Sequence, residues 1–163
     1  MTGIGSGVVL GYDMKSAAKA VKEENERVAD LIGINKAART TTVKPSGTSS
    51  LVLGTSSGIH AWHNDYYIRR IRVGKNEAIY DYLLRNHPDL VEDEYFRPHD
   101  TAVISVPQKA PEGATLRTES AFQLLERVKF ISENYVKAGH RSGMNTHNVS
   151  ATISLQIVTG KLI

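Results

Sequence analysis

The sequence predicts a mixed α/β fold, because segments rich in β-branched residues alternate along the chain with amphipathic helical segments. The chain has 163 residues, of which 40% are hydrophobic and 23% charged, as is typical of one globular domain with a real core. Neither an internal repeat nor a low-complexity tract interrupts this pattern. Because strands alternate with helices, we expect mostly parallel strand pairing.

Three longer helices are predicted from hydrophobic periodicity and from end signals. The first covers 14–32, where Asp13 is a suitable N-cap and Gly33 a stop signal. The second covers 76–86 and ends before a His-Pro pair. The third runs from 118 to about 137, with apolar residues spaced along one face.

Four strands are predicted between these helices, from β-branched or alternating patterns that proline or glycine bounds. They are 39–44, 66–73, 101–106 and 147–154.

Composition excludes several function classes. The sequence contains no cysteine, which rules out disulfides, thiolate metal sites and cysteine nucleophiles within this chain and fits a reducing cytoplasm. The net charge of +3 is too small to indicate a nucleic-acid partner. No apolar run approaches the roughly 20 residues of a membrane helix, so we expect no membrane partner and a cytoplasmic location.

The stretch after the first predicted strand is the most informative for function. Pro45 is followed by Ser46, Gly47, Thr48 and Ser49, and then by a predicted short helix at 51–53. A phosphate group needs converging backbone N–H groups, small side chains that allow its approach, and hydroxyl donors. On spacing alone, a simple turn in which a hydroxyl caps the helix is equally consistent with these residues and more common.

Three other segments each have a functional and a structural interpretation. His60 and His63 could share a metal ion, although separate hydrogen-bonded histidines are more common. The segment 139–143 could form an anion nest around Arg141, or only a helix end. Tyrosines and arginines in 66–72 could bind RNA, or form a solvated strand.

Four segments, in this order, carry a resemblance to a known family. They are Thr41-Thr-Val-Lys-Pro-Ser-Gly-Thr48, Gly58-Ile-His60, Tyr66-Tyr-Ile-Arg-Arg70 and Thr146-His-Asn-Val-Ser150. With these motifs the chain resembles the adenosylcobalamin-dependent (class II) ribonucleotide reductases, and among them the type that uses ribonucleoside triphosphates. The resemblance runs from about residue 2 to residue 154, and the Lys-Pro-Ser-Gly-Thr segment is its most specific part.

The resemblance implies that residues 1–154 are part of a ten-stranded α/β barrel, incomplete in this chain, and that 155–163 form a divergent tail. It implies that Ser46, Gly47, Thr48 and Ser49 bind the phosphates of a ribonucleoside triphosphate substrate. For a complete enzyme it also implies adenosylcobalamin as cofactor and a thioredoxin-like protein as reductant.

The family's chemistry depends on cysteines, one of which forms a thiyl radical, and this chain has none. We therefore expect no catalytic residue and no bound metal in this chain, and no turnover by it alone; the remaining reductase polypeptide would be its partner. Two alternatives remain open. The chain could be a non-catalytic nucleotide- or phosphate-binding module, or a subunit that completes a split reductase.

Overall fold

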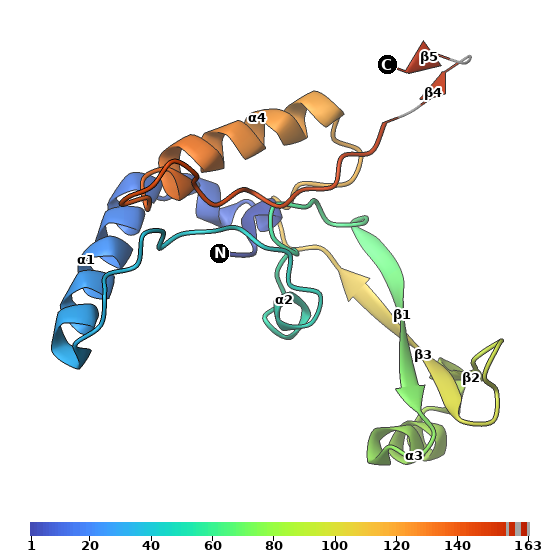
Figure 1. Cartoon of the computed structure of the whole chain (residues 1–163). Coiled ribbons are helices and arrows are strands. Elements are labelled where there is room, and N and C mark those ends of the chain that lie inside the picture. The colour runs from blue at the N-terminus through green and yellow to red at the C-terminus, as the bar shows by residue number, and fades with distance from the viewer. Residues whose placement is uncertain (156, 159–160, 163) are drawn as a thin grey trace. The chain divides into compact units, whose positions relative to one another are not determined.

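The computed structural model describes residues 1–155, 157–158 and 161–162, and the chain divides into two compact units (Figure 1). Unit 1 contains Met1–His63 and Pro111–Ile163, and unit 2 contains Asn64–Ala110. Within the described residues, every helix is too short or too polar to cross a membrane.

The first helix of unit 1, α1, spans Met14–Ile32, as the sequence predicts. The carboxylate of Asp13 accepts hydrogen bonds from the backbone N–H groups of Lys15 and Ser16, each at 3.1 Å. Gly33 ends the helix with a φ of +72°, a left-handed conformation that glycine adopts without strain. Local signals at both ends therefore fix this helix.

The second long helix of unit 1, α4, spans Ala121–Ile131 and continues into a π-helical segment, η4, at Ser132–Val136. It begins three residues later than predicted, because Ser120 and Gln123 form a capping box there. The segment predicted as one helix is thus α-helical to Ile131 and π-helical from Ser132. At that end the hydroxyl of Thr41 lies 2.9 Å from the carbonyl oxygen of Tyr135, to which it donates.

The remaining elements of unit 1 are short. They are η1 (Ile4–Ser6), η2 (Val8–Gly11), α2 (Ser49–Val52), β4 (Ile157–Val158) and β5 (Lys161–Leu162). A hydrophobic core joins the N-terminal segment, α1, α4 and the extended segments of this unit. Its buried members are Ile4, Met14, Val43, Ile59, Leu124, Ile131 and Val136.

Two of the predicted strands, 39–44 and 147–154, are wrong as continuous strands. Both segments are extended, but they are joined only at isolated positions, of which Val43 with Val149 is a parallel bridge. The reason is that the backbone N–H of Thr40 donates to the carbonyl oxygen of Gly139, at 3.1 Å, in the turn after η4. Part of the first segment thus bonds to a turn instead of a strand.

Unit 2 is a three-stranded sheet in the order β1-β3-β2. Its elements are β1 (Tyr66–Gly74), α3 (Ala78–Asn86), η3 (Pro88–Leu90), β2 (Val91–Asp93) and β3 (Thr101–Lys109). Both strand pairs are antiparallel, so the expectation of mostly parallel pairing is wrong for this sheet. The connection through α3, η3 and β2 returns to the end of β1 at which it began, because Gly74 pairs with Thr101 and the backbone N–H of Lys75 donates to the carbonyl oxygen of Asp100 at 2.8 Å.

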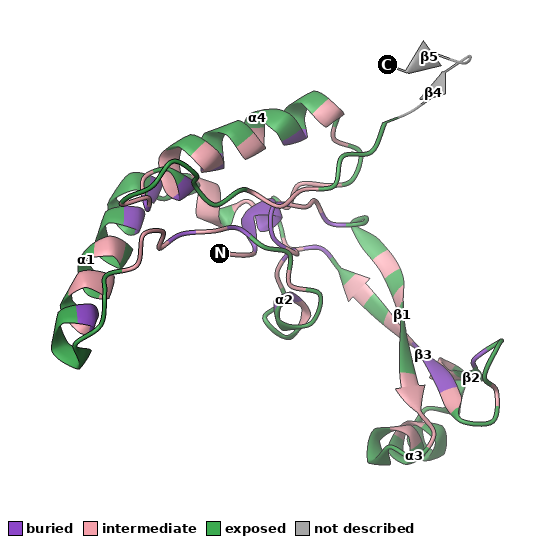
Figure 2. Cartoon of the chain, in the orientation of Figure 1, coloured by how far each residue is buried: buried purple, intermediate pink, exposed green. Residues whose placement is uncertain are grey.

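Burial in unit 2 is concentrated where β3 runs beside β2 (Figure 2). Ala102, Val103 and Ile104 are at most 7% exposed, whereas Tyr66 and Ile68 at the start of β1 are each 67% exposed. The sheet is therefore well covered near β2 and open at its other end.

Candidate phosphate-binding loop

The loop singled out in the sequence is a turn that leads into α2. The side-chain oxygen of Ser46 accepts a hydrogen bond from the backbone N–H of Ser50, at 3.1 Å. The hydroxyl of Ser50, which is 2% exposed, donates in return to the carbonyl oxygen of Ser46. The helix begins at Ser49, two residues earlier than predicted. Ser46 thus has the capping role that the sequence left open.

The tip of the loop is open to solvent. Gly47, Thr48 and Ser49 are exposed, and Ser46 is half-buried. A Cβ atom added to Gly47 would meet no heavy atom of the chain within 4 Å. The side chain of Thr48 makes no capping hydrogen bond to α2. Of the four predicted phosphate-binding residues, one therefore supports the turn and three form an accessible surface.

A second layer of residues supports this loop from beneath. Gly58 has a φ of +61°, and a Cβ atom there would lie 3.1 Å from the backbone of Pro45. The hydroxyl oxygen of Thr2 accepts the backbone N–H of Gly58 at 2.7 Å and lies 3.3 Å from the side-chain oxygen of Ser46. The sequence pattern gave no signal for Thr2, because 44 residues separate it from Ser46.

The segment that enters the loop is held on both sides. Val43 is fully buried and bridges to Val149, while Thr41 is 2% exposed. The ring Nδ1 of His147 lies 3.0 Å from the carbonyl oxygen of Thr41. These contacts bring the first and last of the four family-like segments together beside the loop.

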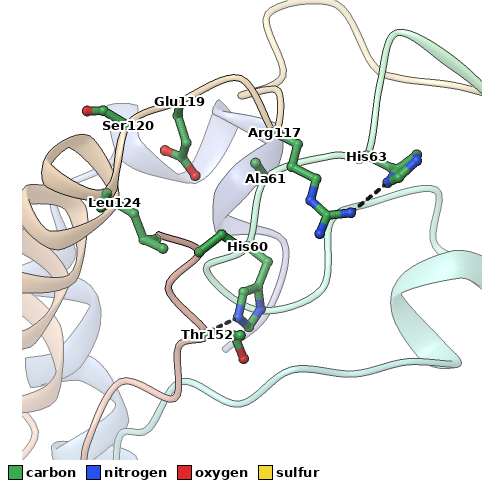
Figure 3. A pocket seen from close by; sticks show the side chains of 10 residues that line it. His60, Ala61, His63, Arg117, Glu119, Ser120, Leu124 and Thr152 are labelled. Carbon is green, nitrogen blue, oxygen red and sulfur yellow. Dashed lines mark hydrogen bonds between the residues drawn. The ribbon is translucent and has the colours of Figure 1, made fainter. Parts of the chain in front are cut away.

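A cavity of about 260 Å³ in unit 1 contains both histidines of the proposed metal pair, but each has a different partner (Figure 3). His60 Nε2 accepts the backbone N–H of Thr152 at 2.9 Å, and its Nδ1 lies 3.0 Å from the carbonyl oxygen of Ser57. His63 Nδ1 accepts from Arg117 at 3.1 Å. Across the described ranges, no cluster of three or more His, Cys, Asp or Glu side chains is placed to hold a metal ion.

The segment 139–143 has a structural role. Arg141 donates to the carboxylate of Glu26 at 3.1 Å and to the carbonyl oxygens of Lys22 and Ala37 at 3.0 and 3.2 Å. Its guanidinium is thus committed to α1 and the segment after it. These contacts favour the helix-end interpretation over an anion nest.

The arginine-rich strand of unit 2 is paired with acidic residues. Arg70 forms an ion pair with Glu92, and Arg72 Nε lies 3.3 Å from Glu94. Burial would raise the pKa of Glu94, but hydrogen bonds from the backbone N–H groups of Phe96 and Arg97 and from Arg72 outweigh it and lower the pKa. The pairing reduces the positive charge that an RNA surface would need.

Comparison with known proteins points to one family. No family model matches the chain. A "probable adenosylcobalamin-dependent ribonucleoside-triphosphate reductase" from Dictyostelium discoideum is 30% identical over 119 residues, which are 70% of this chain and 14% of that protein. An adenosylcobalamin-dependent ribonucleoside-triphosphate reductase from Lactobacillus helveticus is 26% identical over 147 residues, or 90% of this chain and 18% of that protein. The chain therefore spans less than a fifth of the length of these relatives.

A solved structure agrees with these relatives. The crystal structure of a B12-dependent (class II) ribonucleotide reductase matches 75% of this chain and 17% of its own chain, with 25% identity and a TM-score of 0.62. The match supports the family resemblance that the sequence motifs carry.

Proposed function

Since the chain is homologous over most of its length to a small part of adenosylcobalamin-dependent ribonucleoside-triphosphate reductases, we propose that it is the substrate-phosphate-binding portion of such an enzyme. The observation that carries the proposal is the exposed tip at Gly47, Thr48 and Ser49, held on the buried residues Val43 and Ser50. A match of 147 residues within a chain of 163 necessarily includes this loop.

In the proposed site, the loop orients a triphosphate by hydrogen bonding. The hydroxyl groups of Ser46, Thr48 and Ser49 and backbone N–H groups of the turn donate to phosphate oxygens, and bonds to a charged acceptor are roughly twice as strong as neutral ones. Gly47 leaves room for the anion, because it has no Cβ. The contribution of these residues is positioning, which lowers the entropic barrier of a reaction elsewhere on the nucleotide.

The complete enzyme would form its ten-stranded barrel from this chain and the remaining polypeptide. Two parallel bridges in unit 1, Val43 with Val149 and Trp62 with Leu116, support neighbouring parallel strands of that kind. We place the assembled enzyme in the cytoplasm, in deoxyribonucleotide synthesis for DNA replication, with a thioredoxin-like protein as its reductant.

The cofactor of the relatives does not fit the residues of this chain. The cavity in unit 1 has about 260 Å³, below the range of about 300–1,000 Å³ of pockets for drug-sized ligands, and a corrin with its adenosyl group is larger still. A pocket of about 530 Å³ in unit 2 is lined by charged side chains such as Arg70, Glu92 and Glu94, which do not suit an apolar corrin face. The sequence also has no cysteine to carry a thiyl radical. We therefore derive no radical or redox step from this chain and propose that it does not turn over alone.

The lack of cysteine also favours a second candidate function of a different class. A chain that binds nucleotide without redox residues could serve as a phosphate-binding module or as the completing subunit of a split reductase. Both candidates use the same loop. They differ in whether activity appears when a cysteine-containing reductase polypeptide is added.

The loop is tested by Gly47→Val in the purified 163-residue chain, with binding of ATP and of inorganic tripolyphosphate measured by calorimetry. We expect binding to be abolished, because the branched side chain occupies the approach path of the anion, while the melting temperature stays unchanged in the open space there. Gly11→Val is the matched control, since Gly11 is also exposed and has no neighbour within 4 Å of an added Cβ. Unchanged affinity in Gly47→Val would return the loop to a purely structural role.

A further inference from the structure

The hydroxyl of Thr2 connects three segments beneath the loop. Its oxygen accepts the backbone N–H of the buried Gly58 at 2.7 Å. It lies 3.3 Å from the side-chain oxygen of Ser46 and also 3.3 Å from the carbonyl oxygen of Ser56. The Thr2 hydrogen therefore has two acceptors at equal distance.

Ser46 has one hydroxyl hydrogen to give. Its oxygen already accepts the N–H of Ser50 at 3.1 Å, so the hydrogen can go either to Thr2 or outward from the loop. When it goes to Thr2, the Thr2 hydrogen goes to Ser56, and all of these groups are satisfied. When it goes outward, Thr2 can turn its own hydrogen from Ser56 to Ser46 by rotation about one bond.

We infer that Thr2 is a positioning residue for the loop, one that holds the Ser46 oxygen and exchanges the donor role with it when a phosphate group binds. A bond from Ser46 to a charged phosphate oxygen is stronger than its bond to a neutral hydroxyl, so an anion draws the Ser46 hydrogen outward. Thr2 then fills the vacated position as donor. The inference rests on the proposed function of the loop and adds a residue outside it.

A double-mutant cycle separates this role from simple structural support. The variants are Thr2→Val, Ser46→Ala and both together, with Thr2→Ser as the conservative control, and the readouts are tripolyphosphate affinity and melting temperature. Ser46→Ala is expected to weaken binding about 10-fold, the loss of one hydrogen bond to a charged group. Thr2→Val is expected to weaken it about 5-fold alone and less than about 2-fold in the Ser46→Ala background.

Stability should behave differently from affinity. Thr2→Val removes the acceptor of the buried Gly58 N–H, so it should lower the melting temperature in both backgrounds, including the one without the Ser46 hydroxyl. Thr2→Ser keeps the hydroxyl and should restore binding to within about 2-fold of the parent chain.

Provided that Ser46→Ala weakens tripolyphosphate binding, two results would overturn the role of Thr2 without affecting the proposed loop. One is an unchanged affinity in Thr2→Val. The other is an equal loss of affinity from Thr2→Val in the parent chain and in the Ser46→Ala background. If Ser46→Ala itself leaves the affinity unchanged, the proposed phosphate-binding function of Ser46 fails, and the role of Thr2 fails with it.

Discussion

Replacing Arg127 with methionine is expected to destabilise unit 1 strongly, because it would leave the buried carboxylate of Glu119 without its cationic partner. Arg127 on α4 and Glu119 before it form an ion pair at 2.7 Å, and their side chains are only 10% and 13% exposed. Arg127 also donates to the carbonyl oxygen of Ile59, at 3.2 Å, next to His60. The pair thus ties α4 to the segment that follows the loop.

The expected magnitude follows from this burial. Removing one partner of a buried ion pair costs about 3–5 kcal/mol, because the other charge stays uncompensated. A domain of this size loses about 2–4 °C of melting temperature per kcal/mol, so Arg127→Met should lower it by roughly 6–20 °C. The double variant Arg127→Met with Glu119→Gln removes both charges and should recover most of that loss.

The single tryptophan gives a clean assay. Trp62 is the only tryptophan of the sequence, is 6% exposed and belongs to unit 1, so its fluorescence reports on this unit during urea or thermal unfolding. A loss under about 1 kcal/mol in Arg127→Met, or a double variant as unstable as the single one, would refute the reasoning, since either result means that the buried charge is not the source of the cost.

Two further predictions concern single side chains. Ser120→Ala removes the capping box of α4 and should cost about 0.5–2 kcal/mol by the same fluorescence assay, whereas the exposed Thr118→Ala serves as control. Glu94 has a lowered pKa in the folded chain, so its stabilisation of unit 2 is present above the ordinary glutamate value of about 4.3 and is lost as the pH falls through the lower folded value. The protection of the Phe96 and Arg97 N–H groups against hydrogen exchange, measured relative to their intrinsic exchange rates at each pH, should therefore fall in acid. Glu94→Gln should remove most of this pH dependence, and a pH response equal to that of the parent chain would contradict the assignment.

Local signals explain which parts of the fold the sequence predicts. The helix at Met14–Ile32 is correct at both ends, because Asp13 and Gly33 act within a few residues of the helix itself. The strand at Tyr66–Gly74 follows from its own residue pattern and extends one residue beyond the prediction. In each case the information lies inside the element.

The pairing of strands depends on contacts between residues far apart in the sequence, and the residue pattern did not predict these contacts. The direction of β3 against β1 is set by the path of the connection, and the alternation of strand and helix does not encode that path. The segment at 39–44 has a strand-like composition, but Thr40 bonds to Gly139, 99 residues away. The same limit applies to the proposed site: the chemistry of Ser46 to Ser49 suggested phosphate binding and the family resemblance implied it, whereas Thr2 was found only in the structure.

The anchoring of the loop, more than its composition, decides whether it can bind an anion. Fixing the backbone of one residue costs about 1–2 kcal/mol, so ordering seven flexible residues would cost about 7–14 kcal/mol. A net hydrogen bond to a charged group returns about 1.5–3 kcal/mol, so three hydroxyl donors return about 4.5–9 kcal/mol, which is less than most of that range. In this chain Thr41, Val43 and Ser50 are buried on either side of the tip. Lys44 donates its backbone N–H to Met1, the ring of Pro45 fixes its φ, and Ser46 is bonded to Ser50, so Gly47, Thr48 and Ser49 are the residues left to order. The cost then falls to about 3–6 kcal/mol, which the same donors can match.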